Sequence, residues 1–227
     1  MKPRVLIATF LLLTGTGLSA QTSPTVIGLY NTGMGTSSTY KLVSSPYGTP
    51  GAVGLYEPSS SVWPINDVWI DNTASTQWLA VGFASTATTD RIPTVAAGNY
   101  TIRLNFDLGS YNPATTGFTI HAAADNRLAV SLNGFILPNY GTASGDVNYS
   151  SLASYAYTVA GTGSGLHAGA NYIDFVVTNV VGGGDNPAGL YVAFSEFTTA
   201  VPEPSTYALL LGLGTGVIVV WRRRRRR

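Results

Sequence analysis

No segment between residues 21 and 200 repeats apolar side chains at the 3.6-residue period of an α-helix. Short apolar runs alternate instead with residues that favour turns. The clearest run is residues 99–108, where Tyr100, Ile102 and Leu104 alternate with polar side chains. A period of two is typical of a strand with one buried face. We therefore expect an all-β fold rather than alternating strands and helices.

About ten strands are expected between residues 21 and 200. Asn133 and Gly134 stand between two of the apolar runs, and both residue types accept a positive φ, so they predict a two-residue hairpin. The irregular spacing of the runs favours a two-sheet β-sandwich. The expected strands are residues 25–30, 66–70, 77–83, 99–108, 117–122, 127–132, 135–137, 155–159, 172–177 and 190–197.

The chain contains no cysteine. Thiol catalysis and thiolate metal sites are therefore excluded, and the fold depends on packing rather than on disulfides. Glycine occurs 26 times and charged residues make up only 10% of the chain. That composition agrees with strands joined by tight turns.

The C-terminal residues have three parts in a fixed order. Residues 201–206 contain two prolines, which interrupt regular structure. Residues 207–221 are apolar and predict a single transmembrane helix, although 15 residues span only about 22 Å of a hydrocarbon core of about 30 Å. A basic tail follows and should hold that end in the cytoplasm. These topology determinants are Arg222, Arg223, Arg224, Arg225, Arg226 and Arg227.

This C-terminal pattern resembles the PEP-CTERM sorting signal of exported proteins in Gram-negative bacteria that make exopolysaccharide. The matching sorting motif is Pro202, Glu203 and Pro204, followed by the apolar run and the arginines. The resemblance implies cleavage near this motif by a membrane-embedded transpeptidase, exosortase, and release of the body towards the cell surface. It covers residues 201–227 only. The alternative is an ordinary membrane anchor with positive flanks.

The N-terminal residues predict a secretory signal peptide. Lys2 and Arg4 precede an apolar stretch, residues 5–13, and small residues lead to Ala20, after which we expect cleavage. The Sec machinery and signal peptidase are then partners. The expected organisation is a signal peptide over residues 1–20, a β-sandwich ectodomain over 21–200 and a sorting and anchor segment over 201–227.

The ectodomain is acidic although the whole chain carries a formal charge of +1. Its four cations are Lys41, Arg91, Arg103 and Arg127, against ten of the eleven acidic residues, which gives a net charge of −6. Four scattered cations make no basic patch, so we expect no nucleic-acid partner.

A second resemblance concerns the body. Residues 66–197 are similar in motif order to a galactose-binding-like jelly roll. The motifs include a segment from Asp125 to Gly134 that ends in Asn-Gly, and a turn from Leu166 to Asn171 before an apolar strand. The resemblance implies a jelly-roll-like β-sandwich. Many domains of that class bind sugars and many do not, so the fold does not decide the function.

Five aromatic residues are candidates for carbohydrate binding, because flat rings stack on the C–H faces of sugar rings. Trp69 and Trp78 lie among apolar residues, so we expect them in the sandwich core, with sugar stacking as the alternative. Trp63, before a proline, is expected to be exposed in a loop, and for this residue sugar stacking and a packing role are equally compatible with the sequence. Tyr111, and also Tyr140, are secondary candidates in turn-rich segments.

Asp67, Asp71 and Asp185 are candidate oxygen ligands for Ca²⁺, although none has the spacing of a known calcium loop. Their alternative role, which we favour, is to bond their own backbone in turns. His121 and His167 lack metal-ligand spacing, and no Gly-x-Ser-x-Gly motif is present. We therefore expect no catalytic residues and no cofactor apart from Ca²⁺.

The sequence thus predicts an exported, non-enzymatic protein of the cell envelope or surface. It would be anchored in the inner membrane with a periplasmic body before sorting, and would then associate with exopolysaccharide or surface matrix. The alternatives are a structural or adhesive protein that binds other proteins, and a glycan hydrolase with two facing carboxylates.

Overall fold

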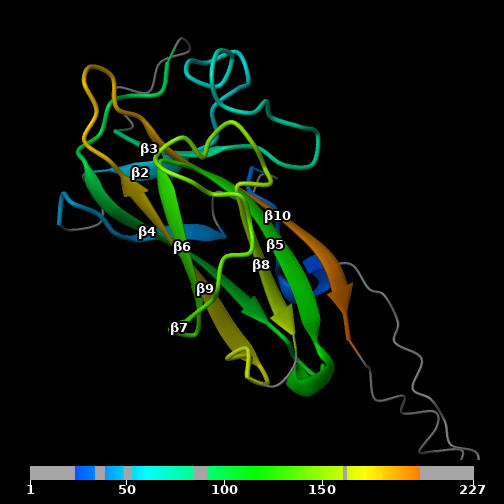
Figure 1. Cartoon of the computed structure of the whole chain (residues 1–227). Helices are drawn as coiled ribbons and strands as arrows, with labels where there is room; N and C mark the ends of the chain where they lie inside the picture. Colours follow the sequence, from blue (N-terminus) through cyan, green and yellow to red (C-terminus); the bar gives the residue numbers. More distant parts are fainter. Residues whose placement is uncertain (1–23, 34–38, 49–52, 84–90, 161–162, 200–227) are drawn as a thin grey trace, which may run out of the picture.

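The computed structural model describes residues 24–33, 39–48, 53–83, 91–160 and 163–199, and these residues form two antiparallel β-sheets (Figure 1). They contain no α-helix, only two short 3₁₀ turns, η1 at Pro24–Ile27 and η2 at Pro113–Thr115. The all-β prediction is therefore confirmed. The expected signal peptide, transmembrane helix and arginine tail lie outside the described residues. Within the described ranges, no helix is long and apolar enough to cross a membrane.

Each sheet has five strands. The first sheet has the order β1-β4-β9-β6-β7 and the second has the order β2-β3-β10-β5-β8. The strands are β1 Tyr40–Ser44, β2 Gly54–Tyr56, β3 Leu79–Gly82, β4 Gly98–Asp107, β5 Gly117–Asp125, β6 Arg127–Leu132, β7 Phe135–Ile136, β8 Tyr155–Ala160, β9 Ala170–Asn179 and β10 Ala188–Thr198.

The chain passes repeatedly from one sheet to the other. Each sheet contains a group of four strands, β3-β10-β5-β8 in one sheet and β4-β9-β6-β7 in the other. The remaining strands, β1 and β2, each lie at the edge of a sheet. Only Asn126 separates β5 in one sheet from β6 in the other. Two sheets built from such non-local pairings are consistent with the jelly-roll-like sandwich expected from the sequence.

The main core lies between the two sheets. Strand β4 supplies Tyr100, Ile102 and Leu104, each with 0% of its surface exposed. Strand β10 of the other sheet supplies Leu190 and Val192, which are equally buried. The alternation predicted for residues 99–108 is therefore confirmed, because every second side chain of β4 enters this core.

The predicted hairpin at Asn133 and Gly134 is also confirmed. Both residues have a positive φ, 51° and 83°, and they join β6 to β7. The side chain of Asn133 adds tertiary contacts: its Nδ2 donates to the carbonyl of Gly165 at 2.8 Å, and its Oδ1 accepts from the backbone of Tyr172 at 2.9 Å. The turn is thus held against the start of β9.

Two expected strands are wrong. Residues 25–30 begin with the 3₁₀ turn η1, and residues 66–70 form tight turns in which the carbonyl of Pro64 accepts from Val68 at 2.9 Å and from Trp69 at 3.1 Å. Ile27, Leu29 and Trp69 of these segments are buried by tertiary packing rather than by strand pairing, whereas Val68 is exposed. Strands β1 and β2 were missed, because β1 exposes most of its residues and β2 has only three.

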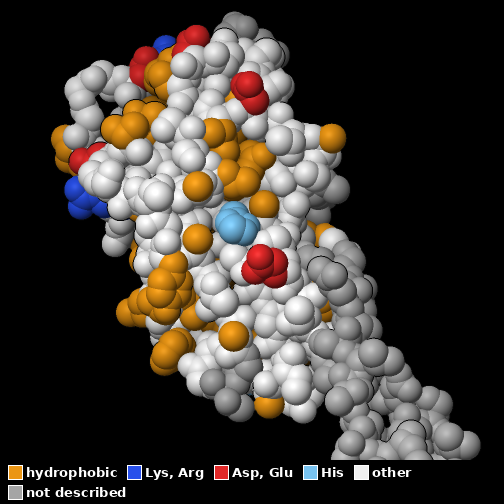
Figure 2. All heavy atoms as spheres, turned by 45° about the vertical axis from the view of Figure 1, so that its right-hand side comes forward, with side chains coloured by type: hydrophobic (Ala, Val, Ile, Leu, Met, Phe, Trp, Pro, Cys, Tyr) orange, Lys and Arg blue, Asp and Glu red, His pale blue; other side chains and the backbone are white. Residues whose placement is uncertain are grey.

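A second apolar cluster covers the outer face of the second sheet. The loop between β2 and β3 contributes Val62, Ile65 and Trp69, which pack on Ala123 of β5 and Tyr191 of β10. This loop lies at the top of the view in Figure 1, around residues 57–78. Charged side chains are few and scattered over the face that Figure 2 shows, in keeping with the composition.

Candidate functional site: loop aromatics and an apolar groove

Trp69 and Trp78 are buried, with 4% and 0% of their surface exposed. Their ring centroids lie 4.2 Å apart, and the ring of Trp78 meets Tyr191 edge-on at 5.5 Å. The two tryptophans fill the second apolar cluster and not the core between the sheets, which corrects the sequence expectation. Their ring faces are not available for stacking on a sugar.

A buried carboxyl group lies beneath Trp69. Asp125, at the end of β5, is 5% exposed, and its Oδ2 accepts a hydrogen bond from the indole N–H of Trp69 at 3.1 Å. Burial raises the pKa of Asp125 to about 7, and the Trp69 hydrogen bond opposes part of that rise. The sequence did not predict that this group is buried, because nothing in the local pattern shows that a loop covers it.

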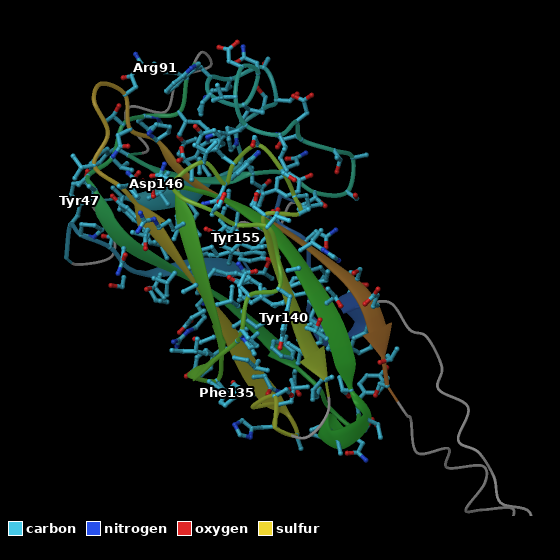
Figure 3. The ribbon with its side chains drawn as sticks, in the orientation of Figure 1. Tyr47, Arg91, Phe135, Tyr140, Asp146 and Tyr155 are labelled. Atoms are coloured by element: carbon cyan, nitrogen blue, oxygen red, sulfur yellow. The ribbon has the colours of Figure 1, made fainter. Side chains whose placement is uncertain are left out.

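Trp63 lies at the surface of the same loop and is half-buried. Its carbonyl accepts from the backbone of Ile92 at 2.7 Å, and the guanidinium carbon of Arg91 lies 5.6 Å from its ring centroid. That separation is within the range of a cation–π contact. Arg91 also forms an ion pair with Asp185, about half of each side chain being exposed. Figure 3 labels Arg91 at the top of the view.

Asp185 is held on its other side as well. Its Oδ1 accepts from the hydroxyl of Thr94 at 3.2 Å, and that hydroxyl accepts from the backbone of Asn186 at 3.3 Å. We name Trp63, Arg91 and Asp185 the Trp63 cluster. The sequence predicted Trp63 as a sugar-stacking ring and Asp185 as a metal ligand, in separate sites. The structure brings these two residues together through Arg91, which was not a candidate.

The other predicted candidates lie outside the Trp63 cluster. Tyr111 is half-buried and packs edge-on against Phe197 at 6.3 Å. Asp67 and Asp71 are exposed in the loop between β2 and β3. No group of three or more His, Cys, Asp or Glu side chains comes together in the described ranges. The calcium site stays a prediction.

The histidines lie on the surface in two different settings. Nε2 of His121 and the hydroxyl of Ser195 are 3.0 Å apart on the outer face of the second sheet, and a neighbouring residue, Glu196, has a φ of 55°. His167 is exposed in the turn before β9, and its backbone N–H donates to Oδ1 of Asn171 at 2.8 Å. The Ser195–His121 pair lies outside the lining of both grooves described next.

Open grooves lie on the surface of the described residues, among them a larger and a smaller one. The larger, of about 610 Å³, lies between residues 135–140 and the end of β8 and includes Phe135, Tyr140 and Thr158 in its lining. The smaller, of about 320 Å³, is lined among others by Arg127 and Tyr155. Phe135, Tyr140 and Tyr155 are labelled in Figure 3. The linings of these two grooves contain no carboxylate.

Comparison with known proteins adds one finding at the C-terminus. Residues 200–226 carry a PEP-CTERM protein-sorting motif. No curated protein and no solved structure matches the chain. The expected sorting signal is confirmed, and it contains Pro202, Glu203, Pro204 and all but the last of the six arginines.

The PEP-CTERM motif is the signal that exosortase recognises, so it identifies that partner in general terms. It indicates an exported protein, made as a membrane-anchored precursor and sorted to the surface. It carries no information on what the two sheets bind.

Proposed function

We propose that this protein is a non-enzymatic β-sandwich that is sorted to the cell surface and binds a polysaccharide of the surface matrix at the Trp63 cluster. The observation that carries the proposal is the Arg91 side chain, which contacts the ring of Trp63 and pairs with Asp185. An aromatic ring, hydrogen-bond donors and a carboxylate acceptor therefore lie side by side at the surface.

That combination suits a sugar. The C–H face of a pyranose stacks on an aromatic ring, while its hydroxyl groups both donate and accept hydrogen bonds. Arg91 supplies donors only and Asp185 supplies acceptors only, so a pair of neighbouring hydroxyls would find one partner of each kind. The net charge of −6 on the body favours a neutral polysaccharide over a polyanion.

The non-enzymatic part of the proposal is supported by the same surface. Glycoside hydrolysis needs two carboxyl groups that flank one bond. The two grooves have no carboxylate in their lining, and Asp185 of the Trp63 cluster is already paired with Arg91.

The test is binding of the purified protein to the native exopolysaccharide, measured by affinity electrophoresis. Trp63→Ala should raise Kd by about tenfold, which corresponds to a loss of about 1.4 kcal/mol of stacking and contact. Val68→Ala is the matched control, because Val68 is an exposed apolar residue of the same loop, 46% exposed.

Asp185→Asn should also weaken binding, since it removes the charge that pairs with Arg91 but keeps an acceptor oxygen in place. A wild-type protein without measurable affinity for the polysaccharide, or a Trp63→Ala variant with unchanged Kd, would remove the proposal.

A further inference from the structure

Strand β8 is the outer strand of its sheet, and the first part of its free edge is already covered. The carbonyl of Ala156 accepts from the backbone of Tyr140 at 2.8 Å, and its N–H donates to Oδ1 of Asn139 at 3.2 Å. Both bonds point away from β5. In an antiparallel ladder outward and inward positions alternate, so Thr158 and Ala160 also direct their backbone groups outward.

The outward backbone groups of Thr158 and Ala160 have no hydrogen-bond partner among the residues that the structure describes. An unpaired edge is a template for another strand, and proteins usually protect it with lysine, proline, a bulge or a very short strand. Strand β8 reads Tyr-Ala-Tyr-Thr-Val-Ala over six residues and has none of these protections.

The surface beside this edge is apolar and uncharged. Phe135, Ile136 and Tyr140 are 51%, 75% and 69% exposed, and they are three of the seven large hydrophobic side chains that the described residues expose. Phe135 and Tyr140 line the larger groove together with Thr158 and Ala160, and no charged residue belongs to that lining. Figure 2 shows a group of hydrophobic side chains on the surface of the sandwich, at the lower left of the view.

We infer that this edge joins a second copy of the chain, with β8 antiparallel to β8 of that copy and Thr158 opposite Ala160. The unpaired groups are backbone donors and acceptors at the spacing of a strand, which a polysaccharide cannot match. An antiparallel edge can satisfy itself, because a two-fold axis places the same groups on both sides. The bodies of two copies, residues 21–200, each carry −6 and would repel one another, and an uncharged edge is where that repulsion is weakest.

The register follows from the covered part of the edge. Pairing Thr158 with Ala160 places the two-fold axis at Val159 and leaves Ala156 in its existing bonds to residues 139 and 140. Pairing Thr158 with itself would place Ala160 opposite Ala156, whose backbone groups are already used. The chosen register joins two five-stranded sheets edge to edge.

Cysteine cross-linking tests the register directly, because the chain has no cysteine of its own. Full-length T158C and A160C variants, carrying different tags, are produced together and exported into the oxidising periplasm. We expect a disulfide-linked pair that contains both tags. T158C produced with T198C, whose threonine is exposed on β10, is the control and should give none. Equal cross-linking in the two combinations would overturn the proposed pairing.

A charge on the edge tests the association itself. Thr158→Lys places an ammonium group on an exposed side chain and brings two like charges close together in the dimer, so the molar mass of the detergent-solubilised full chain should fall from two copies to one. Thr198→Lys should stay dimeric. A Thr158→Lys dimer would show that the copies meet elsewhere, for example through residues 207–221, and a wild-type monomer would show that the edge does not join two copies. Either result would overturn the inference.

Discussion

Asp125 is buried under the loop that carries Trp69, and its ionisation is therefore coupled to folding. Its carboxyl group has a pKa of about 7 in the folded protein, against an ordinary value of 3.8, because burial disfavours the charged form. Between these two values the folded chain keeps a proton that the unfolded chain has released. The free energy of unfolding must then fall as the pH rises from about 4 to about 7.

Asp125→Asn should remove this loss of stability. An asparagine oxygen can still accept the hydrogen bond from Trp69, and the amide stays neutral at every pH. We expect variant and wild type to be equally stable near pH 4 and the variant to be more stable at pH 8, by up to about 4 kcal/mol from a shift of about three pKa units. Thermal unfolding in a pH series measures the difference. An equal pH dependence for the two proteins would contradict the assignment.

At the scale of elements, the loop of residues 57–78 docks on the second sheet through a close approach to one glycine. A Cβ added at Gly189 of β10 would lie 2.5 Å from the ring of Trp69 and 3.1 Å from that of Trp78. These distances leave no room for a methyl group. The two tryptophans therefore pack directly on the backbone of β10.

Gly189→Ala should lower the free energy of unfolding by about 1–3 kcal/mol, because the tryptophan rings must shift and a packed cluster resists such shifts. Gly54→Ala is a matched control in the same sheet, since nothing lies within 4 Å of a Cβ added there. Chemical denaturation of both variants checks the prediction. A Gly189→Ala variant as stable as the Gly54→Ala variant would show that the loop packs elsewhere.

At the scale of the whole molecule, folding and sorting depend on different parts of the chain. The last strand, β10, ends at Thr198, and the sorting motif covers residues 200–226. Replacing Pro202, Glu203 and Pro204 together by alanine should leave the sandwich folded and keep the precursor in the membrane fraction.

Cell fractionation with intact-mass measurement tests this prediction. Wild-type protein in a host without exosortase is the control, and it should accumulate in the membrane like the alanine variant. Surface-located protein from the alanine variant, with the mass of a processed chain, would show that sorting does not use these three residues.

Local pattern was enough to predict the strands that have one buried face and the turns between them. Residues 99–108 alternate because one side faces the core, and Asn133 and Gly134 accept the φ values that their hairpin needs. The interpretation of residues 66–70 as a strand was wrong. A short apolar run has the same sequence pattern whether it pairs with a neighbouring strand or packs as part of a loop.

The all-β class and the sorting to the surface could be predicted from the sequence, because residue periodicity and the sorting motif are both local along the chain. Which residues meet became known from the folded structure. Trp63, Arg91 and Asp185 come from three separate loops, the partner strand of β8 lies over thirty residues away along the chain, and Asp125 is buried by a segment far from it. Contacts of this kind arise from the pairing of distant strands, which no local pattern specifies.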